Sequence, residues 1–206
     1  MIQQCYIVTL NFVDNVIITP IVTENVIFWV ILMSKPFVFK ARLNVADLFH
    51  HANHQEVFTT ALQKAETLEH FVLKMLGYCA LSYEQAACLN NLSEKQKPDV
   101  WLEDKQGHIT VALFAGVMEL GDIIRIAKQY KKLVLLIKED SEWFDSVKER
   151  LSYVENISIF ALEEDFLDSL SEALSRSLHW DIVIEQNQIS VSDKTEYYET
   201  NVLKLL

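Results

Sequence analysis

The central stretch of the chain, residues 98–137, reads PDVWLEDKQGHITVALFAGVMELGDIIRIAKQYKKLVLLI. Its first part has the pattern of two strands, residues 98–103 and residues 108–114, separated by a polar turn. Gly107 closes that turn and can supply the positive φ that tight turns require. We therefore expect a hairpin at the start of the stretch.

The second part of the stretch predicts a helix followed by a buried strand. Residues 119–131 are apolar at helical spacing, and residues 132–137, KLVLLI, are almost wholly apolar, as in a strand buried on both faces. A strand, a helix and a second strand in this order favour a right-handed crossover connection.

The flanking sequence continues the same alternation of strands and helices. Residues 37–45 alternate apolar and polar side chains, and residues 57–62 are the expected antiparallel partner across a polar turn. The sequence thus predicts an α/β fold with a mixed sheet flanked by helices. Further segments are expected as helices at 66–80, 141–151 and 163–175, and as strands at 157–161, 180–185 and 189–192.

The helix expected at residues 66–80 has an amphipathic pattern. Its spacing predicts one face packed against the sheet and the other in solvent, because residues three and four apart share a face. The buried face would carry Leu68, Val72, Met75 and Cys79, and the solvent face Glu69 and Lys74.

Length, charge and cysteine content restrict the class of protein. The 206 residues, half of them hydrophobic, suit a single domain with one sizeable core. The net charge of -11 disfavours nucleic acid as a partner, because phosphates would be repelled. Cys5, Cys79 and Cys88 have no CxxC spacing, which fits a reducing compartment, and we expect a cytoplasmic protein.

Residues 1–32 differ in composition from the remainder. They contain no Lys or Arg, which a secretory signal would need, and their uncharged apolar run at residues 26–33 is far shorter than the roughly 18 residues of a membrane span. We interpret Met33 as the translation start, residues 1–32 as a leader outside the fold, and residues 33–206 as a single domain. The alternative is a genuine extra strand or hairpin.

Familiar cofactor motifs are missing from the sequence. The four glycines form neither a GxGxxG nor a Walker A loop, so no nucleotide cofactor is expected. His50, His51 and His54 could face one metal ion from a helical turn, but they lie between two expected strands without a matching carboxylate, and a solvated loop is the default interpretation.

Several segments together resemble the YaeQ family, whose members belong to the PD-(D/E)XK, restriction-endonuclease-like fold. The similar segments extend over residues 33–206: FKARLNVADL near residue 39, ETLEH at 66–70, PDVWLED at 98–104, Gly107, Gly116 and the closing strands. The resemblance implies a restriction-endonuclease-like core. It also implies that Glu66, Glu69 and Asp99 match acids of the family motifs.

The sequence departs from the family pattern at three places. His70 replaces the arginine of the helical motif, Phe114 replaces the second acid of the hairpin, and the following charged cluster is reduced to Glu119 and Asp122. On this resemblance Asp99 is the candidate metal ligand. Glu66, Asp99, Glu119 and Lys128, with Arg125 one turn before the lysine, are the candidate catalytic groups.

Two functions follow from these observations. The first is a non-catalytic binding or regulatory protein with a degenerate nuclease-type site, no cofactor and a protein partner. The alternative is a divalent-metal-dependent nuclease that acts on DNA or RNA with Mg²⁺. A membrane-associated protein is disfavoured, because residues 1–32 lack both length and basic flanks.

Overall fold

A computed structural model describes residues 17–23, 26–32, 37–63, 66–91 and 97–206. The chain divides into two compact units, Met1–Pro36 and Phe37–Leu206. In the first unit, β1 (Ile17–Thr23) and β2 (Val26–Leu32) pair antiparallel. Residues 17–32 thus contain a hairpin, and whether they belong to the native fold or form a leader outside it stays a prediction. The interpretation of Met33 as the translation start falls on a residue outside the described ranges and stays a prediction.

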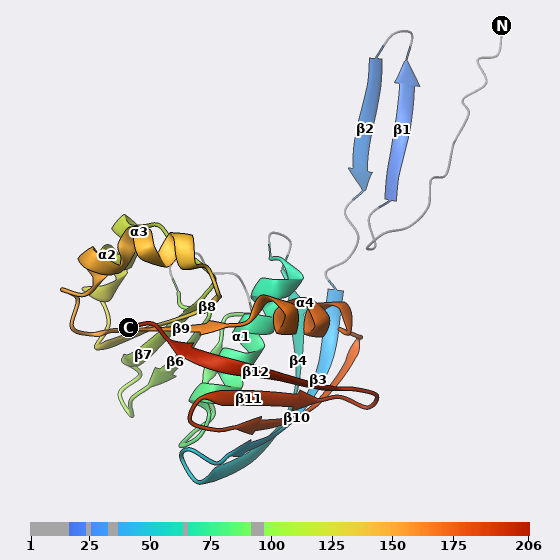
Figure 1. The fold of residues 1–206 in the computed structure, drawn as a ribbon. Coiled ribbons are helices and arrows are strands. Elements are labelled where there is room, and N and C mark those ends of the chain that lie inside the picture. The colour runs from blue at the N-terminus through green and yellow to red at the C-terminus, as the bar shows by residue number, and fades with distance from the viewer. Residues whose placement is uncertain (1–16, 24–25, 33–36, 64–65, 92–96) are drawn as a thin grey trace, which may run out of the picture. The chain divides into compact units, whose positions relative to one another are not determined.

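In the part of the second unit that the structure describes, one mixed sheet has ten strands in the order β4-β3-β10-β11-β12-β9-β8-β7-β6-β5. β3 pairs parallel with β10, and β7, β8 and β9 pair parallel with one another, while the remaining neighbours are antiparallel. Figure 1 shows the sheet curling around α1. The strands are β3 (Phe37–Asp47), β4 (Ala52–Leu62), β5 (Cys88–Leu89), β6 (Val100–Glu103), β7 (Ile109–Ala115), β8 (Lys132–Lys138), β9 (Ile157–Leu162), β10 (Ser177–Ile184), β11 (Gln188–Ser192) and β12 (Tyr197–Lys204).

Among the described residues, four helices pack on the sheet and give it two apolar cores. They are α1 (Leu68–Leu81), α2 (Leu120–Ala127), α3 (Ser141–Leu151) and α4 (Glu164–Glu172). On β8, Val134 and Leu136 join the core beneath α1 and α4, while Leu133, Leu135 and Ile137 join the core beneath α2 and α3. The expectation of a strand buried on both faces is thereby confirmed. No helix within the described ranges is long and apolar enough to cross a bilayer.

Most expected elements are present, with shifted ends. The hairpin of β6 and β7 turns at Gly107, whose φ is +82°. The helices α2 and α4 end several residues before the predicted ends, at Ala127 and Glu172. Two strands were not predicted: the short β5 and the last strand, β12, whose YYETNVLK has alternation but two charged side chains.

The turn between β3 and β4 is shorter than expected. β4 begins at Ala52, so His54 lies within the strand opposite Val45 and not in a surface loop. His50 bonds instead to Asp47, which accepts hydrogen bonds from its backbone N at 2.8 Å and contacts its ring Nδ1 at 2.7 Å. The expected grouping of His50, His51 and His54 in one turn is therefore wrong.

The facing of α1 also differs from the prediction. Every residue from Phe71 to Cys79 is buried, and Lys74 is only 1% exposed, whereas Leu68 at the helix start is 39% exposed. The reason is that α1 is enclosed by the curled sheet and by α4, so it has no solvent face along its middle. At Gly77 an added Cβ would lie 2.8 Å from the side chain of Leu113 on β7, so a larger residue here would require that side chain to shift.

Removal of residues 1–32 is expected to leave the melting temperature nearly unchanged. The reason is that residues from Phe37 onward supply two apolar cores of their own. Differential scanning calorimetry of the full and shortened chains measures the effect. A large fall in melting temperature would show that the first unit contributes to the stability of the second.

Met75→Asp is expected to lower the free energy of unfolding by about 3 to 5 kcal/mol, because it buries an unpaired charge. Met75 is fully buried in the core beneath α1. Urea denaturation measures the change, and Leu68→Asp at the exposed helix start is the matched control. Equal stability of the two variants would contradict the observed facing of α1.

Candidate functional site

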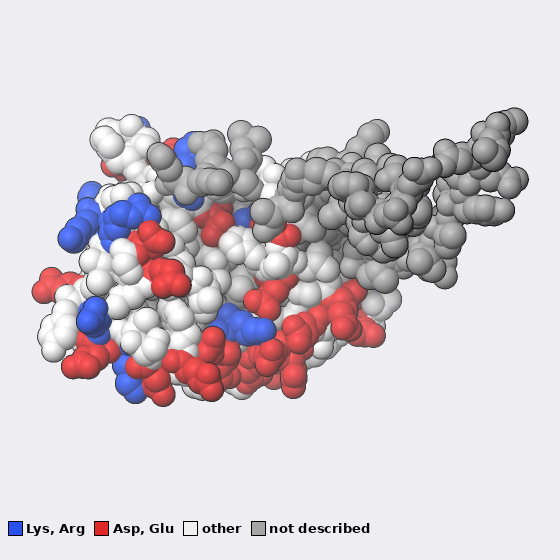
Figure 2. All heavy atoms as spheres, turned by 90° about the horizontal axis from the view of Figure 1, so that it is seen from above, with Lys and Arg blue, Asp and Glu red and all other residues white. Residues whose placement is uncertain are grey.

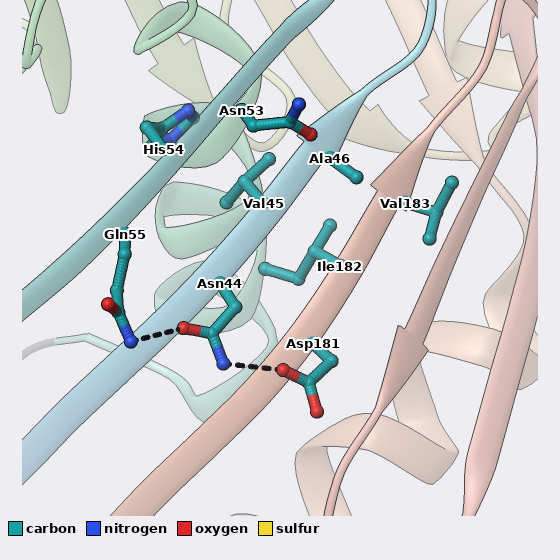
Figure 3. A pocket seen from close by; sticks show the side chains of 9 residues that line it. All are labelled: Asn44, Val45, Ala46, Asn53, His54, Gln55, Asp181, Ile182 and Val183. Carbon is teal, nitrogen blue, oxygen red and sulfur yellow. Dashed lines mark hydrogen bonds between the residues drawn. The ribbon is translucent and has the colours of Figure 1, made fainter.

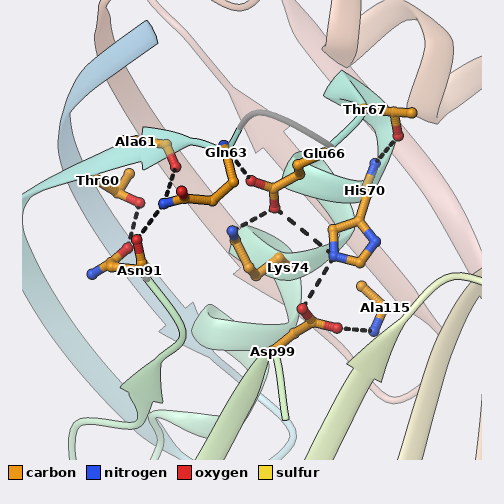
Figure 4. Close-up of polar contacts among 10 residues, drawn as sticks. All are labelled: Thr60, Ala61, Gln63, Glu66, Thr67, His70, Lys74, Asn91, Asp99 and Ala115. Carbon is orange, nitrogen blue, oxygen red and sulfur yellow. Dashed lines mark hydrogen bonds and ion pairs between the residues drawn. The ribbon is translucent and has the colours of Figure 1, made fainter. Parts of the chain in front are cut away.

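A group of polar side chains lies at the start of α1, where the ends of several strands meet. We call Glu66, His70, Lys74 and Asp99 the α1 cluster (Figure 4). Glu66, His70 and Lys74 are spaced four apart, which places them along one side of the helix. Asp99 comes from the residue before β6, so the cluster joins α1 to the β6–β7 hairpin.

The helix start is fixed by a cap. Thr67 precedes α1 with extended backbone, and its hydroxyl accepts a hydrogen bond from the backbone N of His70 at 3.1 Å. This cap satisfies one of the free N–H groups of the first turn.

Glu66 and Lys74 form a buried ion pair. The Lys74 ammonium donates to Glu66 Oε1, and their side chains are 2% and 6% exposed. The other carboxylate oxygen of Glu66 accepts a hydrogen bond from the backbone N of Gln63 at 3.0 Å. Loss of either partner would leave an uncompensated charge inside the protein, which is strongly destabilising.

His70 and Asp99 form a second, half-buried pair. His70 Nε2 lies 3.1 Å from Asp99 Oδ1 and 3.8 Å from Glu66 Oε1. Asp99 Oδ2 accepts a hydrogen bond from the backbone N of Ala115 at 2.9 Å, at the end of β7. Burial lowers the pKa of His70, but the hydrogen bond to Asp99 and the charges of Asp99 and Glu66 outweigh it, so the pKa is raised above its ordinary value.

A third cation lies near the cluster, at the end of β8. Lys138 Nζ lies 3.2 Å from Glu69 Oε2 on α1 and 2.9 Å from Glu164 Oε1 at the start of α4. Its hydrogen bonds to Glu164 and Glu69 raise the pKa of Lys138. Through these two ion pairs, Lys138 links the end of β8 to the starts of α1 and α4. Glu69 is therefore engaged in an ion pair with Lys138.

The structure brings together two of the four candidate catalytic residues. Glu66 and Asp99 both lie in the α1 cluster. Glu119 and Lys128 are exposed at the two ends of α2, and α2 packs on the core at the opposite face of β7 and β8 from α1. Arg125, one turn before Lys128, is paired with Asp122 at 2.7 Å on the surface.

Phe114 does not lie in the α1 cluster. Its ring packs against the core beneath α2 and α3, and its centroid is 6.5 Å from that of Tyr130. The side chain at position 114, where the family pattern has its second acid, therefore packs away from the α1 cluster. The β7 group that reaches Asp99 is the backbone N of Ala115, one residue later.

The donor set of the cluster is already engaged within the protein. Each of its two carboxylates has a cationic partner and accepts from one backbone N–H. Across the described part of the chain, no three His, Cys, Asp or Glu residues form a group that could hold a metal ion.

Sequence reasoning missed Lys74, which it placed in solvent. The signal was present in the spacing, since Lys74 follows Glu66 and His70 at intervals of four residues. A lysine in a helix that is otherwise apolar from Phe71 to Cys79 indicates a buried partner, and Glu66 is the acid on the same side.

A family model described as "YaeQ protein" matches residues 33–202 of the chain. The chain belongs to the YaeQ family. Its YaeQ relatives include the uncharacterized protein YaeQ of Salmonella typhi, 24% identical over 162 residues, which are 77% of this chain and 90% of the relative. The uncharacterized protein YaeQ of Escherichia coli K12 is 22% identical over 171 residues, or 82% of this chain and 94% of the relative.

Two solved YaeQ structures have the same fold. The YaeQ protein from Pseudomonas syringae is 21% identical and superposes with a TM-score of 0.77 over 83% of this chain and 96% of its own. The YaeQ protein from Xanthomonas axonopodis pv. citri is 15% identical, with a TM-score of 0.75 over 82% of this chain and 98% of its own. The curled mixed sheet with flanking helices is thus shared at low sequence identity.

The raised pKa of His70 predicts a fall in stability at higher pH. Protonated His70 stabilises the folded state at pH values below its ordinary pKa of 6.5, and this contribution is lost as the pH rises through the higher folded-state value. We expect His70→Gln to remove that part of the pH dependence of the free energy of unfolding, measured by urea denaturation from pH 5 to 9.

The matched control is His108→Gln, in the turn of the β6–β7 hairpin, where the imidazole is 78% exposed. This variant should keep the slope of the parent. If the free energy of unfolding of His70→Gln depended on pH as that of the parent does, protonation of His70 would not be the source of the pH dependence.

Proposed function

We propose that the chain is a non-catalytic binding or regulatory protein on a restriction-endonuclease-like PD-(D/E)XK core, in which the acids of a nuclease-type site serve as an internal ion-pair network. One observation carries the proposal. Glu66 and Asp99, the two acids that converge, each have a cation and a backbone N–H as partners.

Metal binding at the α1 cluster would be opposed by its own cations. Mg²⁺ takes carboxylate oxygens and waters in octahedral geometry, so it would compete with Lys74 and His70 for the same oxygens. Lys74 could not withdraw into water, because its side chain is 2% exposed. A displaced ammonium beside a divalent cation would add repulsion to the cost of its burial.

The surface charge supports a protein partner over nucleic acid. Figure 2 shows a band of acidic side chains along one side of the face that it presents, with few basic ones between them. Separately, α4 carries four exposed acids, Glu164, Asp165, Asp168 and Glu172. With the net charge of -11, this distribution would repel a phosphate backbone. We place this binding protein in the cytoplasm.

A second candidate is a divalent-metal-dependent nuclease that acts on DNA or RNA. Its support is that two carboxylates lie within 3.1 and 3.8 Å of one ring nitrogen of His70, beside a buried lysine. Acids and a lysine near the attacking water are the groups that metal-dependent nucleases use. In this candidate, Lys74 takes the role that the sequence suggested for Lys128.

The two candidate functions are distinguished by measuring metal binding and nucleic-acid cleavage in the parent and in the Asp99→Ala variant. We expect no heat of Mg²⁺ or Mn²⁺ binding in calorimetry and no cleavage of single- or double-stranded DNA or RNA by either protein. The matched control is Asp145→Ala, which removes an exposed carboxylate on α3 that pairs with Lys148. Metal-dependent cleavage by the parent that is lost in Asp99→Ala and kept in Asp145→Ala would establish the nuclease.

Phe114→Glu would test whether an acid at the family position restores a metal site. We expect no gain of metal binding and a loss of stability, because the new carboxylate would enter the apolar core beneath α2. Calorimetry with Mn²⁺ and a thermal melt of this variant measure both effects. Metal binding gained by Phe114→Glu would show that position 114 can reach Asp99.

A further inference from the structure

One edge of the ten-stranded sheet is a long strand. β4 extends for 11 residues at the end of the strand order, and among the described strands it pairs only with β3. The opposite edge is β5, which has 2 residues. The outer side of β4 therefore presents a row of backbone N–H and C=O groups that another strand can use.

β4 carries one charged side chain, Glu56, and otherwise lacks the features that usually protect an edge strand from pairing. Its sequence, ANHQEVFTTAL, contains no Lys, Arg or Pro, and its pairing with β3 runs without a bulge from Phe37 opposite Leu62 to Asp47 opposite Ala52. Hydrogen bonds from Gln55 to Asn44 and from Asn44 to Asp181 tie β4 to β3 and β10 across the helix-free face (Figure 3). The β4 edge is thus a regular strand without a bulge, and side-chain hydrogen bonds attach it to β3 and β10.

We propose that a second copy of this chain pairs antiparallel with β4 about a two-fold axis through Gln55, so that two sheets join into one. With a two-fold axis perpendicular to the sheet, the helix-covered faces of both copies lie on the same side of the joined sheet. Each residue of β4 then lies opposite a β4 residue of the second copy whose side chain points to the same face. In this register His54 lies opposite Glu56 of the second copy, and Gln55 lies opposite its own counterpart.

Charge selects this register over its neighbours. With the axis at Gln55, His54 of each copy faces Glu56 of the other, so that each carboxylate lies opposite an imidazole that can donate a hydrogen bond to it. An axis at Glu56 would set two carboxylates directly opposite, and this arrangement is destabilising. An axis at Val57 would put Glu56 opposite Phe58 and leave the carboxylate without a polar partner.

The imidazole of His54 has two ring nitrogens without a hydrogen-bond partner among the described residues of the single chain. Both ring nitrogens are shielded from water. Such a buried unpaired group costs free energy. Once the ring turns toward the edge, the carboxylate of Glu56 in the second copy can accept its hydrogen bond.

The same register covers the most exposed apolar side chains of the β3–β4 turn. Leu48 and Phe49 are each 53% exposed at the end of the sheet where β4 begins. Antiparallel pairing about Gln55 brings the turn of one copy beside Ala61 and Leu62 at the far end of β4 in the other. The dimer thus buries apolar surface at both ends of the new strand pair.

Sedimentation velocity of the full chain over a hundredfold concentration range tests the proposal. The expected result is a mass that rises from 23.8 kDa toward twice that value. Glu56→Lys should weaken the dimer at least tenfold, because the two carboxylates opposite His54 are lost, and the double change His54→Glu with Glu56→Lys should restore it. Glu199→Lys, an exposed acid on the interior strand β12, is the control and should dimerise like the parent.

Thermal melts show whether each variant is folded before it is compared. A mass that stays at one chain at all concentrations would overturn the proposal, as would a dimer that Glu56→Lys and Glu199→Lys weaken equally. Hydrogen exchange checks the strand itself. The amides of β4 should exchange more slowly at high concentration, and protection that is already complete at low concentration would mean that a strand of the same chain occupies the edge.

Discussion

The ion pair between Lys74 and Glu66 is the interaction on which the rest of the second unit depends. The middle of α1, from Phe71 to Cys79, is buried along its whole circumference, and the sheet curls around it. A helix in this position can carry a lysine only if an acid accompanies it into the interior. The position of Glu66, just before the helix, is therefore as necessary to the fold as any apolar contact.

The other polar contacts extend outward from this pair. Glu66 also binds the backbone of Gln63 at the end of β4, and His70 continues the chain of contacts to Asp99 and to the last residue of β7. In this way one helix side fixes the positions of an edge strand and of a hairpin from the other half of the sheet. A cluster that performs this structural task has few oxygens left for a ligand, which is why we favour a binding or regulatory role.

The sequence predicted the elements whose pattern is determined by neighbours along the chain. The β6–β7 hairpin and the apolar strand β8 follow from a turn glycine and from a run of Leu, Ile and Val. β12 was missed because its pattern, with Glu199 and Asn201 on the exposed face, becomes recognisable as a strand only between β11 and β9. The α1 cluster was half predicted, since family similarity indicated Glu66 and Asp99. The burial of Lys74 depends on how the sheet encloses α1, and its spacing of four residues from His70 was the only local indication of it.

The position of β12 has a consequence for the order in which the molecule assembles. This last strand lies between β11 and β9, and the residues after it bond to Ile159 through the backbone of Leu205 and Leu206. The eight residues of β12 are the only strand connection between the β4–β3–β10–β11 half and the β9–β8–β7–β6–β5 half within the described sheet. The sheet is therefore continuous from β4 to β5 only once residues 197–204 have been synthesised and have paired with β11 and β9, even though α1 already packs on both halves.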